Sequence, residues 1–380
     1  MKIVIAPNAF KDSMTAIQAA EAIRQGIVRV APGAETVHVH VADGGDGLHD
    51  VFREAFPGVE KKLDVTGPLF SPVPAVYYFM PERKIAVIEM ARASGIALLK
   101  QEERNARRTT TLGTGELVMA AIRDGAKKIL VGIGGSATND GGIGFARAIG
   151  VKFFDADGNE VKPLGDSLGA IAAIDVSGLL FDPAEIAVEA VCDVDNPLTG
   201  ERGAAAVFGP QKGASQEDID FLDAGLANLA RRVRECLGKD LAALPGAGAA
   251  GGLGFGLAAF AGAALRPGVD VVLDMVGIDR ELAGADLAIT AEGRIDFQTA
   301  FGKGPAGVGM RAKKHGVPCL ALAGSLSGDF SGLHDIGIDA CFSLCSGPMS
   351  LDDAIANGAP LLADATEQAF RAFMAGRRER

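Results

Sequence analysis

The first part of the chain alternates short apolar runs with segments of helical spacing. The apolar run "KIVIAP" is followed by residues in which apolar side chains from Ala16 to Ile27 recur three or four positions apart, which is the spacing of one helix face. Thr15 and Gln18 form the signature of a capping box at the start of that helix. After the alternating run "TVHVHV", a second amphipathic segment covers residues 48–55. This β-α-β-α order predicts parallel strands.

The same alternation returns near the end of the chain. The strand-like runs "DLAIT", "VPCLALAG" and "DACFSLC" are separated by a helical segment around "PAGVGMRAKKHG" and followed by a helix near 351–374. Short and nearly continuous apolar strands between helices are typical of a parallel sheet that is buried on both faces. We therefore expect both ends of the chain to contribute to one sheet.

The middle of the chain has a different pattern. The segment "KLDVTGPLFSPVPAVYYFMPERKIAVIEMA" contains several strand-like runs separated by Gly and Pro, with no helix between them, which predicts an antiparallel meander. The expected fold is α/β with two domains. A discontinuous parallel-sheet domain covers 1–69 and 286–380, and an inserted α/β domain covers 70–285.

Composition narrows the class of protein. The 380 residues are 48% hydrophobic and 22% charged, with a net charge of -11, so nucleic acid and anionic membranes are poor candidate partners. The uncharged stretch from Leu241 to Leu265 is interrupted by Pro245 and glycines, which favours a loop and a buried helix over a membrane span. The apolar run at the N-terminus is too short for a signal peptide. Five cysteines without a CxxC pair favour a reduced, cytoplasmic protein. Whether it is a monomer or a homodimer stays open.

Several glycine-rich turns contain acids, amides or basic residues. The stretch "TAEGRIDFQTAFGKGP", residues 290–305, follows an apolar strand and lacks the spacing and the hydroxyl of a P-loop. "GIGGSA" and "GAGAAG" match dinucleotide-binding fingerprints, but 51 glycines make such matches unspecific. Loops of this kind at the carboxyl ends of parallel strands bind ligands in open α/β sheets.

The charged residues of these turns suit phosphoryl transfer, which needs cations around the moving phosphoryl group and carboxylates for Mg²⁺ and for the acceptor proton. Lys212 in "GPQKGA" is expected to be a solvated loop lysine. The candidate cations are Lys11, Arg294 and Lys303. The candidate carboxylates are more numerous than the chemistry requires, so spacing alone does not assign their roles: Asp43, Asp46, Asp140, Asp193, Asp195, Glu292 and Asp296.

The glycine-rich turns, taken together and in order, resemble the glycerate kinase type I family, the bacterial glycerate 2-kinases. The matching segments are "IAPNAFKDSMTAIQAAEAIRQG", "VADGGDG", "GTGELV", "GIGGSATNDGGIG", "CDVDNPLTGERGAAAVFGPQKGA", "PGAGAAGGLG", "AEGRIDFQTAFGKGPAGV" and "LALAGS". The resemblance covers essentially the whole chain. It implies a flavodoxin-like domain, an inserted domain resembling a restriction-enzyme core, and an active site in the cleft between them.

The resemblance also implies an activity: ATP-dependent, Mg²⁺-assisted phosphorylation of D-glycerate to 2-phosphoglycerate and ADP. Alternatives are a kinase of a related small hydroxy acid, transfer to the 3-hydroxyl, or a non-catalytic binding protein. Asp296 is the first candidate for the base or metal ligand and Asp193 the second, with Lys11 and Arg294 also in catalytic roles. Asp140 and Asp193 are the candidate Mg²⁺ ligands. Residues for substrate or phosphate binding are Ser13, Asp43, Ser136, Asn139, Asn196, Glu292, Gln298 and Lys303.

Three positions depart from the family pattern. Asp46 and Leu48 stand where Glu and Thr are more usual, and Ala291 replaces a glycine before Glu292. Alanine is tolerated at that position only if its φ angle is negative. We expect these changes to bear on substrate preference more than on the fold.

Overall fold

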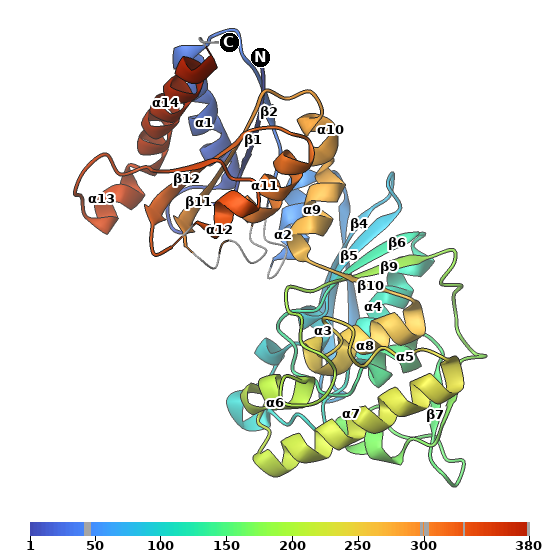
Figure 1. The fold of residues 1–380 in the computed structure, drawn as a ribbon. Coiled ribbons are helices and arrows are strands. Elements are labelled where there is room, and N and C mark those ends of the chain that lie inside the picture. The colour runs from blue at the N-terminus through green and yellow to red at the C-terminus, as the bar shows by residue number, and fades with distance from the viewer. Residues whose placement is uncertain (42–46, 297–298, 300–303, 330, 378–380) are drawn as a thin grey trace. The chain divides into compact units, whose positions relative to one another are not determined.

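The computed structural model describes residues 1–41, 47–296, 299, 304–329 and 331–377. The chain divides into two units, which we call the terminal unit (Met1–Asp43 with Val269–Arg380) and the central unit (Gly44–Gly268). Both are mixed α/β structures, as the sequence predicts (Figure 1).

The terminal unit is built on a five-stranded parallel sheet with the strand order β13-β12-β11-β1-β2. If these five strands are renumbered 1 to 5 along the chain and listed from the β2 edge of the sheet, their order is 2-1-3-4-5. This is the flavodoxin-like doubly wound order. Its strands are β1 (Lys2–Pro7), β2 (Glu35–His38), β11 (Leu287–Ile295), β12 (Cys319–Leu326) and β13 (Ala340–Ser343). Its helices are α1 (Ala16–Val30), α9 (Gly268–Val276), α10 (Ile278–Leu282), α11 (Gly304–Lys314), α12 (Gly332–Asp335), α13 (Leu351–Ala356) and α14 (Gly358–Arg377).

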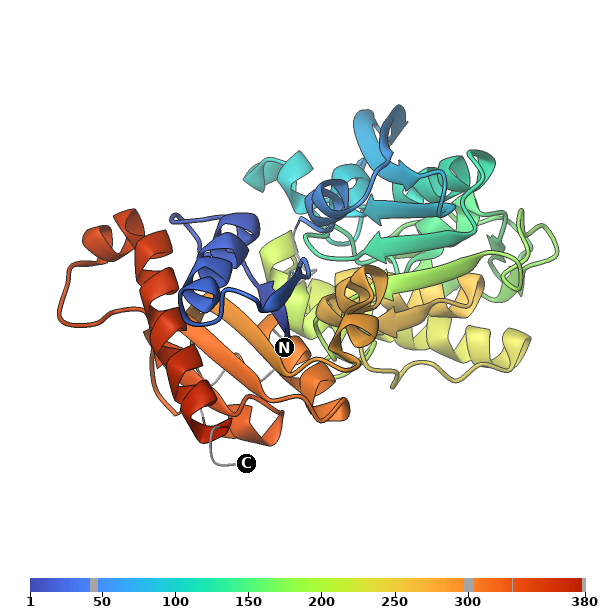
Figure 2. The same cartoon turned by 90° about the horizontal axis from the view of Figure 1, so that it is seen from above.

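Strand β1 shows why this sheet is covered on both faces. Ile3 and Ile5 join the hydrophobic cluster under α1 and α14, whereas Val4 and Ala6 join the cluster under α9 to α12. Successive side chains of a strand point to opposite faces, so a continuous apolar run requires helices on both sides. Figures 1 and 2 show blue α1 beside red α14, the pair that covers one face.

The structure confirms the predicted start of α1 and divides the predicted C-terminal helix in two. Thr15 caps α1, and its side chain and that of Gln18 form the expected capping box. The single helix expected near 351–374 is divided into α13 and α14 at Asn357. Asn357 is the C-cap of α13, and its backbone oxygen accepts a hydrogen bond from Leu361 N in the first turn of α14.

The central unit contains a six-stranded mixed sheet with the order β10-β9-β6-β5-β4-β3 and a two-stranded antiparallel sheet of β7 and β8. Its strands are β3 (Val59–Thr66), β4 (Pro72–Met80), β5 (Ile85–Glu89), β6 (Lys128–Gly132), β7 (Lys152–Phe154), β8 (Ala173–Asp175), β9 (Ala187–Val191) and β10 (Ala264–Arg266). Its helices are α2 (Leu48–Ala55), α3 (Ala91–Ser94), α4 (Leu112–Arg123), α5 (Ile143–Ala148), α6 (Ala204–Phe208), α7 (Gln216–Leu237) and α8 (Ala249–Ala261). Strands β3, β4 and β5 are the predicted antiparallel meander.

The junctions between the units differ from those expected at 69/70 and 285/286. They lie at 43/44 and 268/269. Strand β3 pairs with β4 and therefore belongs to the central sheet. Leu273 of α9 and Ile278 of α10 are buried in the core of the terminal unit. The proposed likeness of the inserted part to a restriction-enzyme core stays a prediction.

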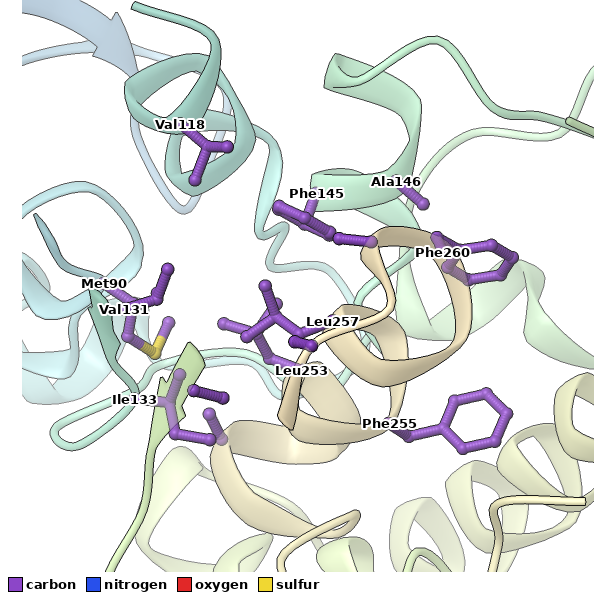
Figure 3. Close-up of a cluster of buried hydrophobic side chains, with 14 of the residues drawn as sticks. Met90, Val118, Val131, Ile133, Phe145, Ala146, Leu253, Phe255, Leu257 and Phe260 are labelled. Atoms are coloured by element: carbon purple, nitrogen blue, oxygen red, sulfur yellow. The ribbon is translucent and has the colours of Figure 1, made fainter. Parts of the chain in front are cut away.

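Helix α8 is the buried helix predicted in the uncharged stretch from Leu241 to Leu265. All its residues are buried, and Leu253 and Leu257 project toward Val131 of β6 and Ile133 (Figure 3). Near its start, Gly251 has a φ of +67°, and a Cβ there would lie 1.9 Å from the carbonyl oxygen of Thr138. Gly251, the last residue of "GAGAAG", therefore allows the backbone of α8 to approach the backbone at Thr138. No helix among the described residues is long and apolar enough to cross a bilayer.

Candidate active site

A cavity of about 570 Å³ opens at the carboxyl edge of the parallel sheet in the terminal unit. It is lined by the loop after β1, by the end of β11, and by residues that follow or end β12 and β13. Strands β1 and β11 are the neighbours at which the winding of the sheet changes direction. Open α/β sheets bind ligands at such a topological switch point, so this cavity is the candidate active site of the unit.

The loop after β1 brings Lys11 and Ser13 to the cavity. The loop is tight, because Phe10 N donates to Met14 O while Ser13 N and Met14 N both donate to Phe10 O. Between the two predicted residues, Asp12 has a φ of +63°, a left-handed conformation that non-glycine residues seldom adopt. Such local strain is often found at functional sites.

Ser13 connects this loop to the C-terminal helices. Its Oγ donates a hydrogen bond of 2.8 Å to the carbonyl oxygen of Ile355 in α13. A Cβ on Gly358, the first residue of α14, would lie 2.3 Å from that Oγ. The glycine at this position is therefore required for the contact between α14 and the loop.

Strand β11 carries Glu292 and Arg294, which the sequence placed in a loop. The strand continues to Ile295, past the end of its neighbour β1, and pairs there with β12. Residues two apart in a strand share a face, so the Glu292 and Arg294 side chains leave the same side of the sheet. Both residues line the cavity. Ala291 is a strand residue and is not among those with positive φ, so its replacement of glycine causes no strain.

Asp296 follows directly after β11 and is nearly buried. Its Oδ2 lies 3.2 Å from Nε of Arg294, and its backbone N–H donates to Oγ1 of Thr299 at 3.2 Å. Thr299 N in turn donates to the carbonyl oxygen of Asp296. The reciprocal bonds hold the backbone of Asp296 in place, so the carboxylate stays beside the guanidinium at the mouth of the sheet.

In the central unit, two groups of predicted residues leave neighbouring strands at the same edge of the sheet. Gly132 of β6 is paired with Val191 of β9, and both strands run in the same direction. The loop after β6 carries Ser136, Asn139 and Asp140. The loop after β9 carries Asp193 and Asn196.

Asp140 is fully buried, and its carboxylate accepts four hydrogen bonds. Thr111 donates from both its backbone N and its Oγ1, at 2.7 and 2.8 Å, and the backbone N–H groups of Gly142 and Gly144 donate at 3.0 and 3.2 Å. Thr111 Oγ1 also accepts from Phe145 N. Burial raises the pKa of Asp140 above its ordinary value, against the opposing effect of these donors. The network joins the starts of α4 and α5.

Asn139, next to Asp140, has no exposed surface, and both polar atoms of its side chain lack a hydrogen-bond partner among the described residues. Unpaired buried amides are costly, at about 1–3 kcal/mol per group. Ser136 is also nearly buried and forms an isolated antiparallel bridge with Gly95.

Lys212 is the residue that the sequence reading missed. It was expected to be solvated, but only 1% of it is exposed, and its Nζ donates a 2.7 Å hydrogen bond to the carbonyl oxygen of Thr138. Burial lowers its pKa to about 7, although the charge of Asp140 acts in the opposite direction. The available signal was the glycine on either side of "PQK", which allows close backbone approach. Gly213, at φ +84°, would place a Cβ 2.6 Å from Arg104 O.

The loop after β9 is held by its own polar side chains. Asp193 Oδ1 accepts a 2.8 Å hydrogen bond from Gly268 N, and Asn196 Nδ2 donates to Arg202 O at 2.8 Å. Asp193 is exposed and Asn196 partly buried. Asp193 therefore remains open to solvent for a role in binding.

Four predicted residues of the terminal unit, Lys11, Ser13, Glu292 and Arg294, line one cavity, and Asp296 adjoins it through Arg294. The predicted residues Asp43, Gln298 and Lys303, and the departure at Asp46, lie outside the described residues. Within the described part of the chain, no group of three or more His, Cys, Asp or Glu is arranged to hold a metal.

Comparison with known proteins agrees with this architecture. The sequence model of the glycerate kinase family matches residues 3–374. The chain is 49% identical to the glycerate kinase of Halalkalibacterium halodurans, over 97% of this chain and 96% of that protein. It is 45% identical to the glycerate 2-kinase of Escherichia coli, over 93% of each chain.

The solved structures include a close match to the fold. The crystal structure of a Salmonella typhimurium LT2 protein assigned as glycerate kinase 2 matches with a TM-score of 0.85 and 42% identity, over 100% of this chain and 99% of that one. The similarity thus extends over both units and over the loops that carry the site residues. The chain belongs to the glycerate kinase family, and it is a kinase.

Proposed function

We propose that this kinase transfers the γ-phosphoryl group of ATP to the 2-hydroxyl of D-glycerate, giving 2-phosphoglycerate and ADP. Family membership supports glycerate as the acceptor, and the name of the Escherichia coli relative supports the 2-position. The observation that carries the assignment is the ion pair between Arg294 and Asp296 at the switch point of the sheet. It puts a cation and a potential base next to the same cavity.

Asp296 is the proposed general base. Its carboxylate takes the proton of the glycerate 2-hydroxyl while the hydroxyl oxygen forms a bond to the γ-phosphorus and the bond between that phosphorus and the bridging oxygen of ADP breaks. The leaving ADP keeps the electrons of the broken bond. A positioned base of this kind contributes about 10²–10⁴-fold to a rate.

Arg294 and Lys11 are the proposed electrostatic partners. The three equatorial oxygens of the transferred phosphoryl group carry negative charge in the transition state, and fixed cations stabilise that charge. Both side chains line the cavity. Lys303 is proposed for the same task, and Ser13, Glu292, Gln298 and Asp43 for substrate or phosphate binding. The ion pair also holds Arg294 in a defined orientation before the substrates bind.

Mg²⁺ is the proposed metal. It is usually held by one or two protein carboxylates together with nucleotide phosphates, so the absence of a carboxylate cluster among the described residues is compatible with it. Asp193, whose carboxylate is solvent-exposed, would be a ligand. When bound, the metal would neutralise phosphate charge.

For the remaining residues of the central unit we propose binding or structural roles. Asn139 offers a buried amide with unused hydrogen-bonding capacity, and Ser136 and Asn196 lie on loops at the same sheet edge. Asp140 was a candidate Mg²⁺ ligand, but four donors surround its oxygens, so we favour a structural role for it. The free cysteines support a cytoplasmic location.

A coupled assay tests the product. The purified protein is incubated with Mg-ATP and D-glycerate, and enolase is added with and without phosphoglycerate mutase while phosphoenolpyruvate is followed. Signal with enolase alone is expected. Signal only after the mutase is added would show transfer to the 3-hydroxyl. Absence of both signals from folded protein, with turnover of tartronate, lactate or hydroxypyruvate, would identify another hydroxy acid as the acceptor.

A further inference from the structure

The cavity of the terminal unit has two chemically different ends. Lys11, Asp12, Ser13, Glu292 and Arg294 line one part, at the ends of β1 and β11, so this part contains two cations and two carboxylates. Another part is lined by the apolar side chains of α13, the start of α14 and the residue after β13, which are Leu344, Leu351, Ala354, Ile355 and Leu361. A ligand that fills the whole cavity can therefore place an anionic group beside Lys11 and Arg294 and an apolar group against α13.

The apolar part has the geometry of a single helix face. Leu351, Ala354 and Ile355 occupy positions i, i+3 and i+4 of α13, which lie on one side of a helix. None of the three contributes to a hydrophobic core, and no residue of α13 is buried. Leu351 is 74% exposed. Single exposed leucines are common, but here the exposed face lines a cavity, which marks a binding surface.

Glycerate does not match this wall. Each carbon of that small acid bears oxygen, so it has little apolar surface to bury, and placing its hydroxyls against leucine and isoleucine would leave them without partners. A cavity of about 570 Å³ is also within the range that holds drug-sized ligands, about 300–1,000 Å³. The cavity thus has space and apolar surface that the acceptor does not use.

A hydrogen bond connects the charged part of the cavity to its apolar part. The hydrogen bond from Ser13 Oγ to Ile355 O connects the loop that carries Lys11 to the helix that carries the apolar face. Gly358 permits this contact, since any side chain there would meet Ser13. The distance between the charged end of the cavity and the apolar face of α13 is therefore set by the fold.

We propose that the apolar face of α13 binds the purine ring of the nucleotide, with the phosphates directed toward Lys11 and Arg294. The inference rests on the proposed use of ATP. A purine nucleotide has flat apolar ring faces and an anionic phosphate chain, so it can contact both the apolar face of α13 and the cations Lys11 and Arg294. The ring lies against Leu351 and Ile355, and glycerate binds outside this wall.

Steady-state kinetics of Leu351→Gln test the proposal. The variant is expected to raise the KM for ATP about three- to tenfold, the effect of losing part of one leucine contact, with the KM for glycerate unchanged. Leu351→Met should restore most of the affinity. Leu180→Gln, which changes an exposed leucine of the central unit, is the matched control and should leave both constants unchanged. An unchanged KM for ATP, or a rise in the KM for glycerate alone, overturns the proposal.

A binding measurement separates this inference from the proposed function. Cys345 lines the cavity, whereas Cys236 on α7 is exposed elsewhere. ADP or adenosine should slow alkylation of Cys345 several-fold, while Cys236 reacts as before and glycerate alone has no effect. Protection by ADP in a protein that fails to phosphorylate glycerate would support the nucleotide wall and reject the proposed acceptor. Glycerate phosphorylation without protection would reject the wall and leave the acceptor intact.

Discussion

The Nε of Arg294 lies 3.2 Å from Oδ2 of Asp296, and the two residues come from the same strand end. The strand positions Arg294 through its pairing with Ser325 of β12, and Thr299 holds the backbone of Asp296. A potential base and its cationic neighbour are therefore placed by backbone hydrogen bonds.

Asp296→Asn is expected to lower kcat by about 10²–10⁴-fold, because the amide has the same size but cannot take the acceptor proton. The melting temperature should stay close to that of the wild type. Asp364→Asn is the matched control, since Asp364 is an exposed carboxylate paired with Arg29 at 2.6 Å in the same unit. Near-normal turnover of Asp296→Asn would show that another group is the base.

The buried Lys212 predicts a pH dependence of stability. Its pKa is about 7 in the folded protein and 10.5 when unperturbed, so between these values the unfolded chain binds more protons. Stability should therefore rise with pH over that window, by at most about 1.4 kcal/mol per pH unit, and should gain nothing from this group below about pH 7.

Lys212→Met removes the titrating group, so the free energy of unfolding in urea should depend less on pH between about 7 and 10. Lys239→Met is the control, because Lys239 Nζ makes a similar 2.7 Å bond to Ala259 O but the residue is exposed. Equal pH slopes for Lys212→Met and the wild type would mean that Lys212 is solvated in the protein.

Asp140→Asn should lower the free energy of unfolding by about 2–4 kcal/mol, because an amide nitrogen would face backbone donors that now meet a carboxylate oxygen. The Mg²⁺ concentration for half-maximal activity should not change. Asp155→Asn is the matched control, because the Asp155 carboxylate accepts backbone N–H groups in an exposed turn. It should lower the free energy of unfolding far less than Asp140→Asn does. A large increase in the Mg²⁺ requirement without loss of stability would instead identify Asp140 as a metal ligand.

Gly358→Ala should displace the loop that carries Lys11, because the new Cβ would lie 2.3 Å from Ser13 Oγ. We expect a lower melting temperature and a higher KM for at least one substrate. Gly376→Ala in the same helix has open space around the new methyl group and should be neutral or slightly stabilising. If both alanine variants behave alike, the contact between α14 and the loop is not rigid.

Hydrophobic periodicity predicted the strands of the terminal sheet and the helical segments of α1, α11 and α13–α14, since a continuous apolar run such as "KIVIAP" can only be buried between two layers of helices. It also predicted the meander of β3 to β5. It did not predict α9, α10 or α12. The first junction was misplaced because the pattern of β3 is compatible with either domain, and its pairing with β4 depends on tertiary contacts. The second was misplaced because Leu273 of α9 and Ile278 of α10 are buried in the core of the terminal unit.

The sequence by itself determined which stretches of the chain carry the polar residues, because glycines and charged side chains mark them, although Glu292 and Arg294 lie on strand β11 and not in a loop. Only the tertiary structure decided which charges are buried. The glycines beside "PQK" indicate a close backbone approach, but the burial of Lys212 depends on Thr138 O and on the fold around it. Likewise, Asp140 and Asp296 are both acids in glycine-rich turns, yet one accepts four hydrogen bonds in the interior and the other lies beside Arg294. Burial and charge pairing depend on residues distant in sequence, and those are set by packing.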